Sequence, residues 1–253
     1  MKKVLISFFV FFSLISAHDS NLVSLGTRYG GWTVPKSILN KGAVCYCVGA
    51  GEDISFDVAL AEKFKCEVYI IDPTPRAIEH FEYLKKSVKE KKIAYINHSS
   101  VDVYNLSKNS FKRLYFLPIG LWKTDTVQKF YYPKNLEHVS CSLTNIQETK
   151  SFFLAECKKL SSLMKDLNHT KLDLLKLDIE GAEYGVLDVI IEENIDIKCL
   201  CIEFDELRMS QKKGKEILSE AYRKFISYKE KLAKMGYEEV FSHQDNITFL
   251  KNV

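Results

Sequence analysis

Residues 43–53 read Ala-Val-Cys-Tyr-Cys-Val-Gly-Ala-Gly-Glu-Asp, an apolar run that ends in two glycines and two acidic residues. The run from Ala43 to Val48 has no polar alternation, which is typical of a parallel strand buried on both faces. Glycines directly after such a strand let the backbone turn sharply and pass close to a ligand. The stretch therefore predicts the first strand of an α/β sheet, followed by a ligand-binding turn.

The rest of the chain repeats this alternation of apolar runs and helical patterns. An alternation at this spacing indicates a Rossmann-like, doubly wound α/β fold with a mostly parallel seven-stranded sheet and an antiparallel closing strand. Residues 126–132 alternate weakly, as an edge hairpin does. The further strands are predicted at 67–71, 114–119, 172–177, 197–204, 237–241 and 247–250, and the helices at 54–64, 76–91, 182–190 and 217–232.

Composition limits the class of protein. The 253 residues suffice for one α/β domain, and 46% hydrophobic with 27% charged residues is typical of a globular protein. The formal net charge of +3 is too small for a dedicated nucleic-acid binder. Of the seven cysteines, four form the pairs Cys45/Cys47 and Cys199/Cys201 within apolar runs. Because this C-x-C spacing differs from the C-x-x-C of zinc sites, we expect buried strand residues and predict no metal site.

The first 17 residues have a pattern of their own. Lys2 and Lys3 precede an apolar run from Val4 to Ile15, and small residues follow. That order is typical of a secretory signal, whereas a membrane-spanning helix needs about 20 apolar residues. We therefore expect residues 1–17 to be a signal peptide or short membrane anchor and residues 18–253 to form a single domain. The alternative is that residues 1–17 form an ordinary buried first element of the fold. A cytoplasmic location is expected only if the segment does not act as a signal or anchor.

The glycine loop supplies the first candidate ligand-binding residues: Gly49, Gly51, Glu52 and Asp53. A dinucleotide fingerprint requires a third glycine, where this chain has Ile54. The missing glycine and the two carboxylates argue against a pyrophosphate ligand and favour a cofactor that carries an ammonium group. A tight turn without a ligand is the alternative.

Asp72 ends the second predicted strand. An acidic residue about 20 positions beyond such glycines typically binds the hydroxyls of a cofactor ribose. Taken alone, Asp72 is equally consistent with a helix cap. Together with Gly49 and Gly51 at the expected separation, it favours ribose binding.

Carboxylates gather at the ends of two later strands. The strand 172–177 leads into Asp178, Glu180 and Glu183, and Glu203 lies near the end of the strand 197–204. Helix capping is one explanation, and binding of a divalent ion or of a hydroxyl acceptor are others. We assign Asp178, with Glu180 beside it, as the catalytic group that orients or deprotonates a hydroxyl. Glu183 and Glu203 are assigned to substrate binding.

Several of these stretches resemble the FkbM-type methyltransferases, and the resemblance covers most of residues 43–250. The Asp-x-Glu-Gly-Ala-Glu motif at 178–183 is fairly specific, whereas the glycine loop is not. Many relatives carry Asn-Ile-Gly after the glycine loop, so this chain belongs to a side branch. The resembling stretches are 47–57, 66–75, 117–122, 132–143, 175–183, 202–203 and 246–249.

The resemblance implies S-adenosylmethionine over Gly49, Gly51 and Asp72, and methyl transfer to a hydroxyl of a sugar, glycolipid or secondary metabolite. His138, within the resembling stretch 132–143, is a second candidate base. The expected partner is a small-molecule or glycan acceptor and not nucleic acid. The N-terminal segment is expected to allow association with a membrane. Nothing in the sequence indicates an oligomeric state.

Two other functions stay open from the sequence. One is a non-catalytic, membrane-tethered or secreted binding module that retains the fold. The other is an NAD-dependent oxidoreductase, which the missing third glycine disfavours. The presence of Gly49, Gly51, Asp72 and Asp178 together argues against loss of catalysis.

Overall fold

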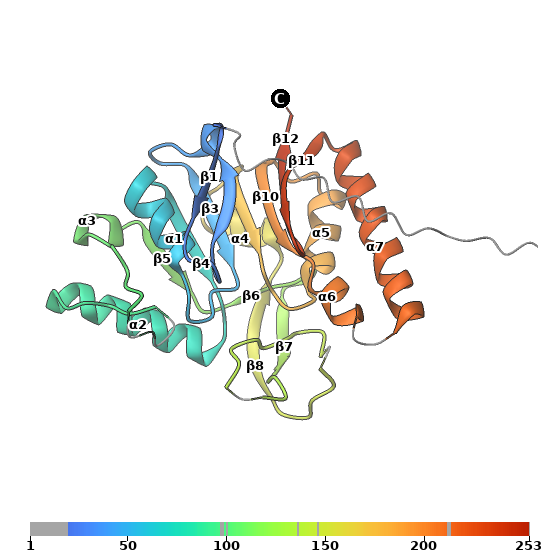
Figure 1. Cartoon of the computed structure of the whole chain (residues 1–253), viewed down its shortest axis with the longest axis horizontal. Helices are drawn as coiled ribbons and strands as arrows, with labels where there is room; N and C mark the ends of the chain where they lie inside the picture. Colours follow the sequence, from blue (N-terminus) through green and yellow to red (C-terminus); the bar gives the residue numbers. More distant parts are fainter. Residues whose placement is uncertain are drawn as a thin grey trace, which may run out of the picture.

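The computed structural model describes residues 20–96, 99, 101–135, 137–145, 147–211 and 214–252. At its centre lies a seven-stranded sheet in the order β11-β12-β10-β9-β3-β4-β5 (Figure 1). Neighbouring strands are parallel except at β12, which is antiparallel to both β10 and β11. This confirms the predicted doubly wound fold. The strands are β3 (Val44–Val48), β4 (Glu67–Ile71), β5 (Leu114–Leu117), β9 (Leu172–Leu177), β10 (Ile197–Glu203), β11 (Tyr237–His243) and β12 (Asn246–Lys251).

Alternate residues of β3 face two separate hydrophobic cores. Cys45 and Cys47 pack into one core, whereas Tyr46 and Val48 pack into the other. A strand buried on both faces has no polar side, which is why its sequence is continuously apolar. Helices cover both faces (Figure 1). They are α1 (Ser55–Ala59), α2 (Pro75–Glu90), α3 (Lys108–Phe111), α4 (Leu160–Asp166), α5 (Glu183–Glu192), α6 (Asp205–Gln211) and α7 (Lys215–Lys234).

The strand order reverses between β3 and β9. From β3 the chain adds β4 and β5 on one side, and from β9 it adds β10 and the last two strands on the other. Val48 pairs with Leu177 at the end of the two parallel strands. The residues that follow, Gly49 and Asp178, therefore lie side by side at the switch point, where ligands bind in such folds.

Two small sheets lie outside the central one. β1 (Leu22–Leu25) and β2 (Trp32–Pro35) form an antiparallel pair that the sequence pattern did not predict. The third sheet consists of β6 (Gly120–Leu121), β7 (Thr126–Tyr131) and β8 (Phe152–Lys158), in the order β6-β8-β7. The edge strand expected at 126–132 is present as β7, which lies at the edge of this third sheet and pairs antiparallel with β8.

Other local predictions have mixed outcomes. The helix predicted over 54–64 is α1 followed by one π-helical turn, η2 (Leu60–Phe64). All seven cysteines are free, and all but Cys141 are buried. The four cysteines of the C-x-C pairs are among the buried ones, as predicted. Residues 1–17 lie outside the described part of the chain. Within the part that the structure describes, no helix combines the length and apolar character that crossing a bilayer requires.

Candidate active site

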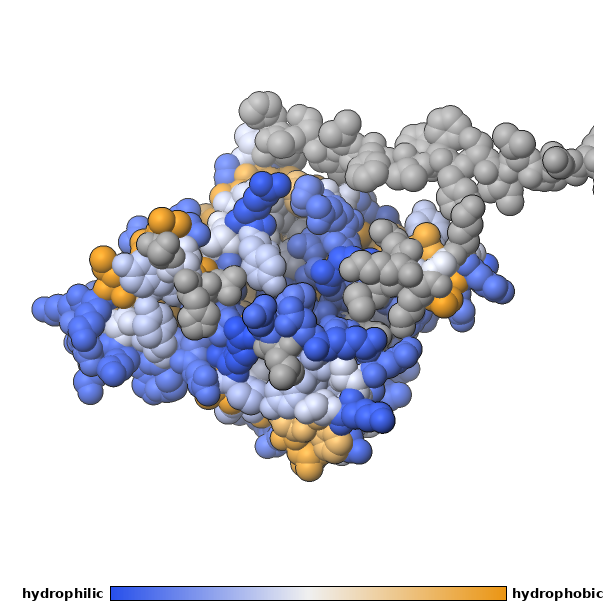
Figure 2. All heavy atoms as spheres, turned by 60° about the horizontal axis from the view of Figure 1, so that its bottom comes forward, coloured by the Kyte–Doolittle hydropathy of each residue, from blue (hydrophilic) through white to orange (hydrophobic). Residues whose placement is uncertain are grey.

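A cavity of about 370 Å³ lies across the switch point, at the carboxyl ends of the parallel strands. Figure 2 brings this lower side of Figure 1 forward and shows a largely hydrophilic surface. The cavity extends from the glycine loop to the ends of β9 and β10, so the structure brings together most of the predicted site residues. Those that line it are Gly49, Gly51, Glu52, Asp53, Asp72, Asp178, Glu180 and Glu203.

Gly49 is required by a close backbone contact. Its φ is +84°, and a Cβ atom there would lie 1.7 Å from the carbonyl oxygen of Asp178. The amide of Asp178 in turn donates a hydrogen bond to the carbonyl of Val48 at 3.1 Å. The glycine loop and the turn after β9 are therefore in direct contact, and the two ends of the cavity share one wall.

Asp72 holds the glycine loop in place. Its Oδ2 accepts hydrogen bonds from the amides of Ala50 at 2.8 Å and Gly51 at 3.1 Å. Its Oδ1 accepts one from the amide of Thr74 at 2.8 Å, just before α2 begins. Each carboxylate oxygen has two acceptor sites, so Oδ1 retains one for a ligand hydroxyl. Asp72 thus positions the loop in addition to lining the cavity.

Glu52 and Asp53 line the cavity, but their carboxylates also bind within the protein. Glu52 forms a two-pronged ion pair with Arg76, with N–O distances of 3.0 and 2.6 Å. Asp53 accepts hydrogen bonds from the hydroxyl of Thr27 at 2.5 Å and from the amide of Ser55 at 2.9 Å. These contacts hold the loop against its surroundings.

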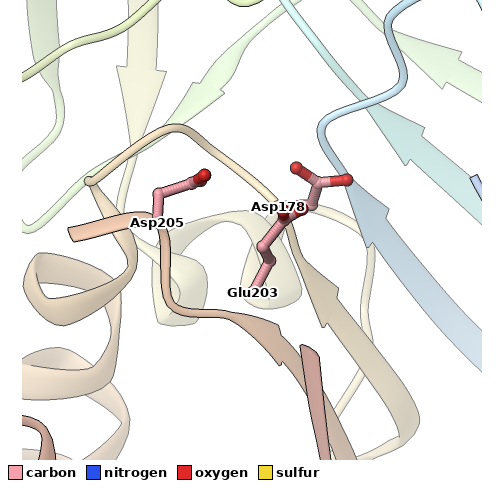
Figure 3. A group of neighbouring side chains, drawn as sticks. All are labelled: Asp178, Glu203 and Asp205. Carbon is pink, nitrogen blue, oxygen red and sulfur yellow. The ribbon is translucent and has the colours of Figure 1, made fainter. Parts of the chain in front are cut away.

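Three carboxylates meet at the opposite end of the cavity (Figure 3). One oxygen each of Asp178, Glu203 and Asp205 lie within 4.8 Å of one another. Burial, together with nearby carboxylates such as that of Asp178, raises the pKa of both Glu203 and Asp205. Both groups therefore favour the protonated form more than ordinary carboxyl groups do.

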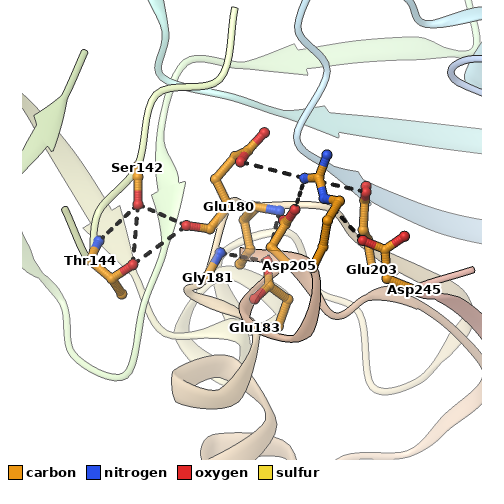
Figure 4. Close-up of polar contacts among 10 residues, drawn as sticks. Ser142, Thr144, Glu180, Gly181, Glu183, Glu203, Asp205 and Asp245 are labelled. Carbon is orange, nitrogen blue, oxygen red and sulfur yellow. Dashed lines mark hydrogen bonds and ion pairs between the residues drawn. The ribbon is translucent and has the colours of Figure 1, made fainter. Parts of the chain in front are cut away.

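Arg208, on α6, supplies positive charge to this acidic end and was not predicted from the sequence. Its guanidinium pairs with Asp205 and lies 3.7 Å from Glu203, 3.9 Å from Glu180 and 3.0 Å from Asp245. Figure 4 labels these four acidic residues. Three carboxylates at this spacing have the donor chemistry that a divalent cation uses. Since Arg208 already pairs with two of these three, Glu203 and Asp205, we assign no metal ion here.

Glu180 faces the same guanidinium from an unusual backbone conformation. Its φ is +54°, in the left-handed region that few non-glycine residues adopt. Its carbonyl oxygen accepts a hydrogen bond from the hydroxyl of Ser142 at 2.7 Å. Burial and the neighbouring Asp178 raise the pKa of Glu180, while its neighbours Ser140 and Arg208 act in the opposite direction. Strained residues of this kind gather at functional sites.

His138 is not brought into the cavity. The residue is exposed, and its backbone carbonyl accepts a hydrogen bond from Arg76 at 3.2 Å. The cavity wall is formed instead by the residues that follow it, Val139, Ser140 and Cys141. The structure therefore does not bring His138 together with the other predicted site residues, because the chain directs its neighbours inward.

Glu183 also lies away from the cavity. It is fully buried, and its Oε1 accepts hydrogen bonds from the amides of Ile179 at 3.1 Å and Gly181 at 3.0 Å (Figure 4). The assignment of Glu183 to substrate binding is therefore wrong, because its carboxyl group closes the turn that presents Asp178. Burial and the nearby Asp205 raise the pKa of Glu183 well above its usual range.

Glu183→Gln is expected to change stability little, since a protonated glutamate and a glutamine have the same shape and the amide oxygen still accepts both hydrogen bonds. Glu183→Ala should lower the free energy of unfolding by about 1–3 kcal/mol, because two partly buried amides lose their acceptor. Chemical denaturation monitored by circular dichroism measures both changes. A glutamine variant as unstable as the alanine variant would contradict this role.

The comparisons with known proteins agree with this geometry. A family model described as the methyltransferase FkbM domain matches residues 46–242. The chain belongs to the FkbM methyltransferase family. The matched region contains all the predicted site residues that line the cavity: Gly49, Gly51, Glu52, Asp53, Asp72, Asp178, Glu180 and Glu203. No curated protein matches the chain.

One solved structure to which this chain is similar is a fibrillarin pre-rRNA processing protein from Methanococcus jannaschii. It has 14% sequence identity and a TM-score of 0.41, and the match covers 84% of this chain and 66% of that chain. This chain thus matches slightly less than two thirds of the length of that structure.

Proposed function

We propose that this FkbM-family chain is an S-adenosylmethionine-dependent O-methyltransferase that acts on a hydroxyl of a sugar, glycolipid or secondary metabolite. One observation carries the proposal: a single cavity joins the glycine loop to the carboxylate of Asp178. Methyl transfer requires a cofactor and an acceptor side by side. A single cavity with a glycine loop at one end and a potential base at the other meets that requirement.

The residues at the first end fit the proposed cofactor. Gly49 and Gly51 line the cavity without side chains, and Asp72 retains an acceptor for a ribose hydroxyl. Gly49, Gly51 and Asp72 would hold the cofactor there. S-adenosylmethionine supplies a methyl carbon that its sulfonium group already activates for displacement.

The residues at the second end fit a hydroxyl acceptor. Asp178 would accept the hydroxyl proton while the hydroxyl oxygen takes the methyl group. The cofactor would supply that methyl group and keep the electron pair of the broken carbon–sulfur bond. Glu203, whose raised pKa favours the protonated form, can donate a hydrogen bond to a second hydroxyl. Fixing both reactants in one cavity can supply about 7–11 kcal/mol of the barrier.

The test is calorimetric titration of the full chain with S-adenosylhomocysteine, with NAD as the comparison ligand. We expect micromolar binding of S-adenosylhomocysteine and none of NAD. Asp72→Ala should weaken the binding at least about tenfold, since the glycine loop loses two of its anchoring hydrogen bonds together with the ribose acceptor. Asp196→Ala, at a side chain that is 61% exposed, is the matched control and should bind normally.

Either of two results would contradict the proposal. Binding of NAD alone would replace the methyltransferase with an oxidoreductase. Absence of binding for both ligands, in a folded protein, would favour a binding module without cofactor chemistry.

A further inference from the structure

Lys176 is a charged side chain inside a strand that is buried along its whole length. It belongs to β9, which lies between β3 and β10, and it is 3% exposed. Removing an ammonium group from water costs several kcal/mol unless partners compensate for it. The contacts of Lys176 therefore indicate why this position carries a charge.

The ammonium of Lys176 contacts both halves of the active site. Its Nζ donates a hydrogen bond to the carbonyl oxygen of Gly49 at 2.5 Å and lies 3.2 Å from Oδ2 of Asp178. Gly49 begins the cofactor loop, and Asp178 is the proposed base. Lys176 thus joins the two sides of the switch point through a single charged group.

A third carboxylate, that of Asp57 on α1, acts on Lys176 electrostatically. Burial alone would lower the pKa of Lys176, but the carboxylates of Asp178 and Asp57 raise it above its usual value, so the group stays charged. Asp57 is itself fully buried, and burial raises its pKa to about 6. The positive charge is therefore stabilised by Asp57 as well as by the two direct contacts.

The surroundings of Asp178 make this ammonium important. Glu180, Glu203 and Asp205 are all acidic neighbours whose raised pKa values include a contribution from Asp178. Arg208 pairs with these three acids and with Asp245, and not with Asp178. Without Lys176, Asp178 would face three acids and lose the ammonium that contacts it.

We propose that Lys176 is a positioning residue that couples the cofactor loop to the base, by fixing the Gly49 carbonyl and the Asp178 carboxylate in one geometry. The inference rests on the proposed function, which makes Asp178 the base. When the cofactor fills the glycine loop, the coupling transmits that occupancy to Asp178. By thermodynamic reciprocity, the ionisation of Asp178 then affects cofactor affinity.

The test needs no knowledge of the acceptor. The full chain is labelled with ¹³C at its aspartate carboxyl groups, and the Asp178 signal is assigned as the one missing in Asp178→Asn. We expect S-adenosylhomocysteine to shift this signal in the wild-type protein. In Lys176→Met the shift should disappear, the midpoint of the signal's pH titration should rise by about one pH unit or more, and S-adenosylhomocysteine should bind about tenfold more weakly.

Lys176→Arg keeps the charge at the same place and should retain the wild-type response of the Asp178 signal to S-adenosylhomocysteine. This variant also tests the inference if the methionine variant does not fold. A purely structural role for Lys176 predicts a lower melting temperature in Lys176→Met with an unchanged Asp178 signal, and that result would overturn the coupling. If S-adenosylhomocysteine fails to bind the wild-type protein, the proposed function fails instead, so the two failures are distinguishable.

Discussion

Asp178→Asn is expected to lower the turnover number by about 10²–10⁴-fold, the range that a general base contributes. An asparagine has the shape of the aspartate but cannot accept the hydroxyl proton. The affinity for S-adenosylhomocysteine should fall by no more than about tenfold, because the substitution keeps the backbone contact with Gly49 and removes only the ion pair to Lys176. Single-turnover kinetics with labelled cofactor and calorimetry measure the two quantities separately.

This prediction needs an acceptor, which a screen of sugars and glycolipids with the wild-type protein should provide. Asp196→Asn is the matched control, because it makes the same chemical change at an exposed aspartate that pairs with Lys251 at the far end of β12. Normal turnover in Asp178→Asn would show that this carboxylate is not the base. A loss of both turnover and cofactor binding would instead indicate that the turn after β9 has collapsed.

The centre of the sheet could be predicted from the sequence because its inner strands, β3 and β9, are buried on both faces. Such strands appear as unbroken apolar runs, and the run 172–177 matches β9 residue by residue. β8 was missed for the opposite reason. Its residues alternate between exposed and half-buried along most of its length, and they belong to a small sheet whose partners are distant in the sequence.

The candidate site was predictable where its residues follow directly on strands. The ends of parallel strands meet at one edge of the sheet, so Gly49, Asp72 and Asp178 had to converge. Sequence alone does not distinguish a carboxylate that enters the cavity from one that turns beneath a helix. Glu180 and Glu183 are only three positions apart, and one lines the cavity while the other is fully buried.

Arg208 and Lys176 were missed because their roles depend on tertiary structure. Arg208 lies on a short helix after β10, where an arginine is more often a solvent-exposed residue. Lys176 did carry a recognisable signal: a lysine within an apolar strand must find a buried partner. The position of this lysine within the apolar run 172–177 is therefore a feature from which a buried ion pair could have been predicted.

Gly49→Ala is expected to destabilise the protein by at least about 4 kcal/mol, which is exceptional for a single substitution. Two effects combine: the added methyl group would lie 1.7 Å from the Asp178 carbonyl oxygen, and the backbone at φ +84° disfavours any side chain. The strand ends must separate to admit the methyl group, and this moves the glycine loop away from Asp178. Any variant that still folds should therefore lose measurable binding of S-adenosylhomocysteine.

Gly42→Ala separates the two effects, because Gly42 has nearly the same φ, +83°, but no atom lies within 4 Å of the added methyl group. It should cost roughly 1–2 kcal/mol from backbone strain alone and leave cofactor affinity unchanged. Chemical denaturation and calorimetry on both variants provide the comparison. If the two substitutions lower the free energy of unfolding equally, the contact between Gly49 and Asp178 is not a tight one. The conclusion that the glycine loop directly contacts the turn after β9 would then be wrong. If Gly49→Ala is far more costly, as the 1.7 Å approach requires, the two halves of the site are joined through backbone as well as through Lys176.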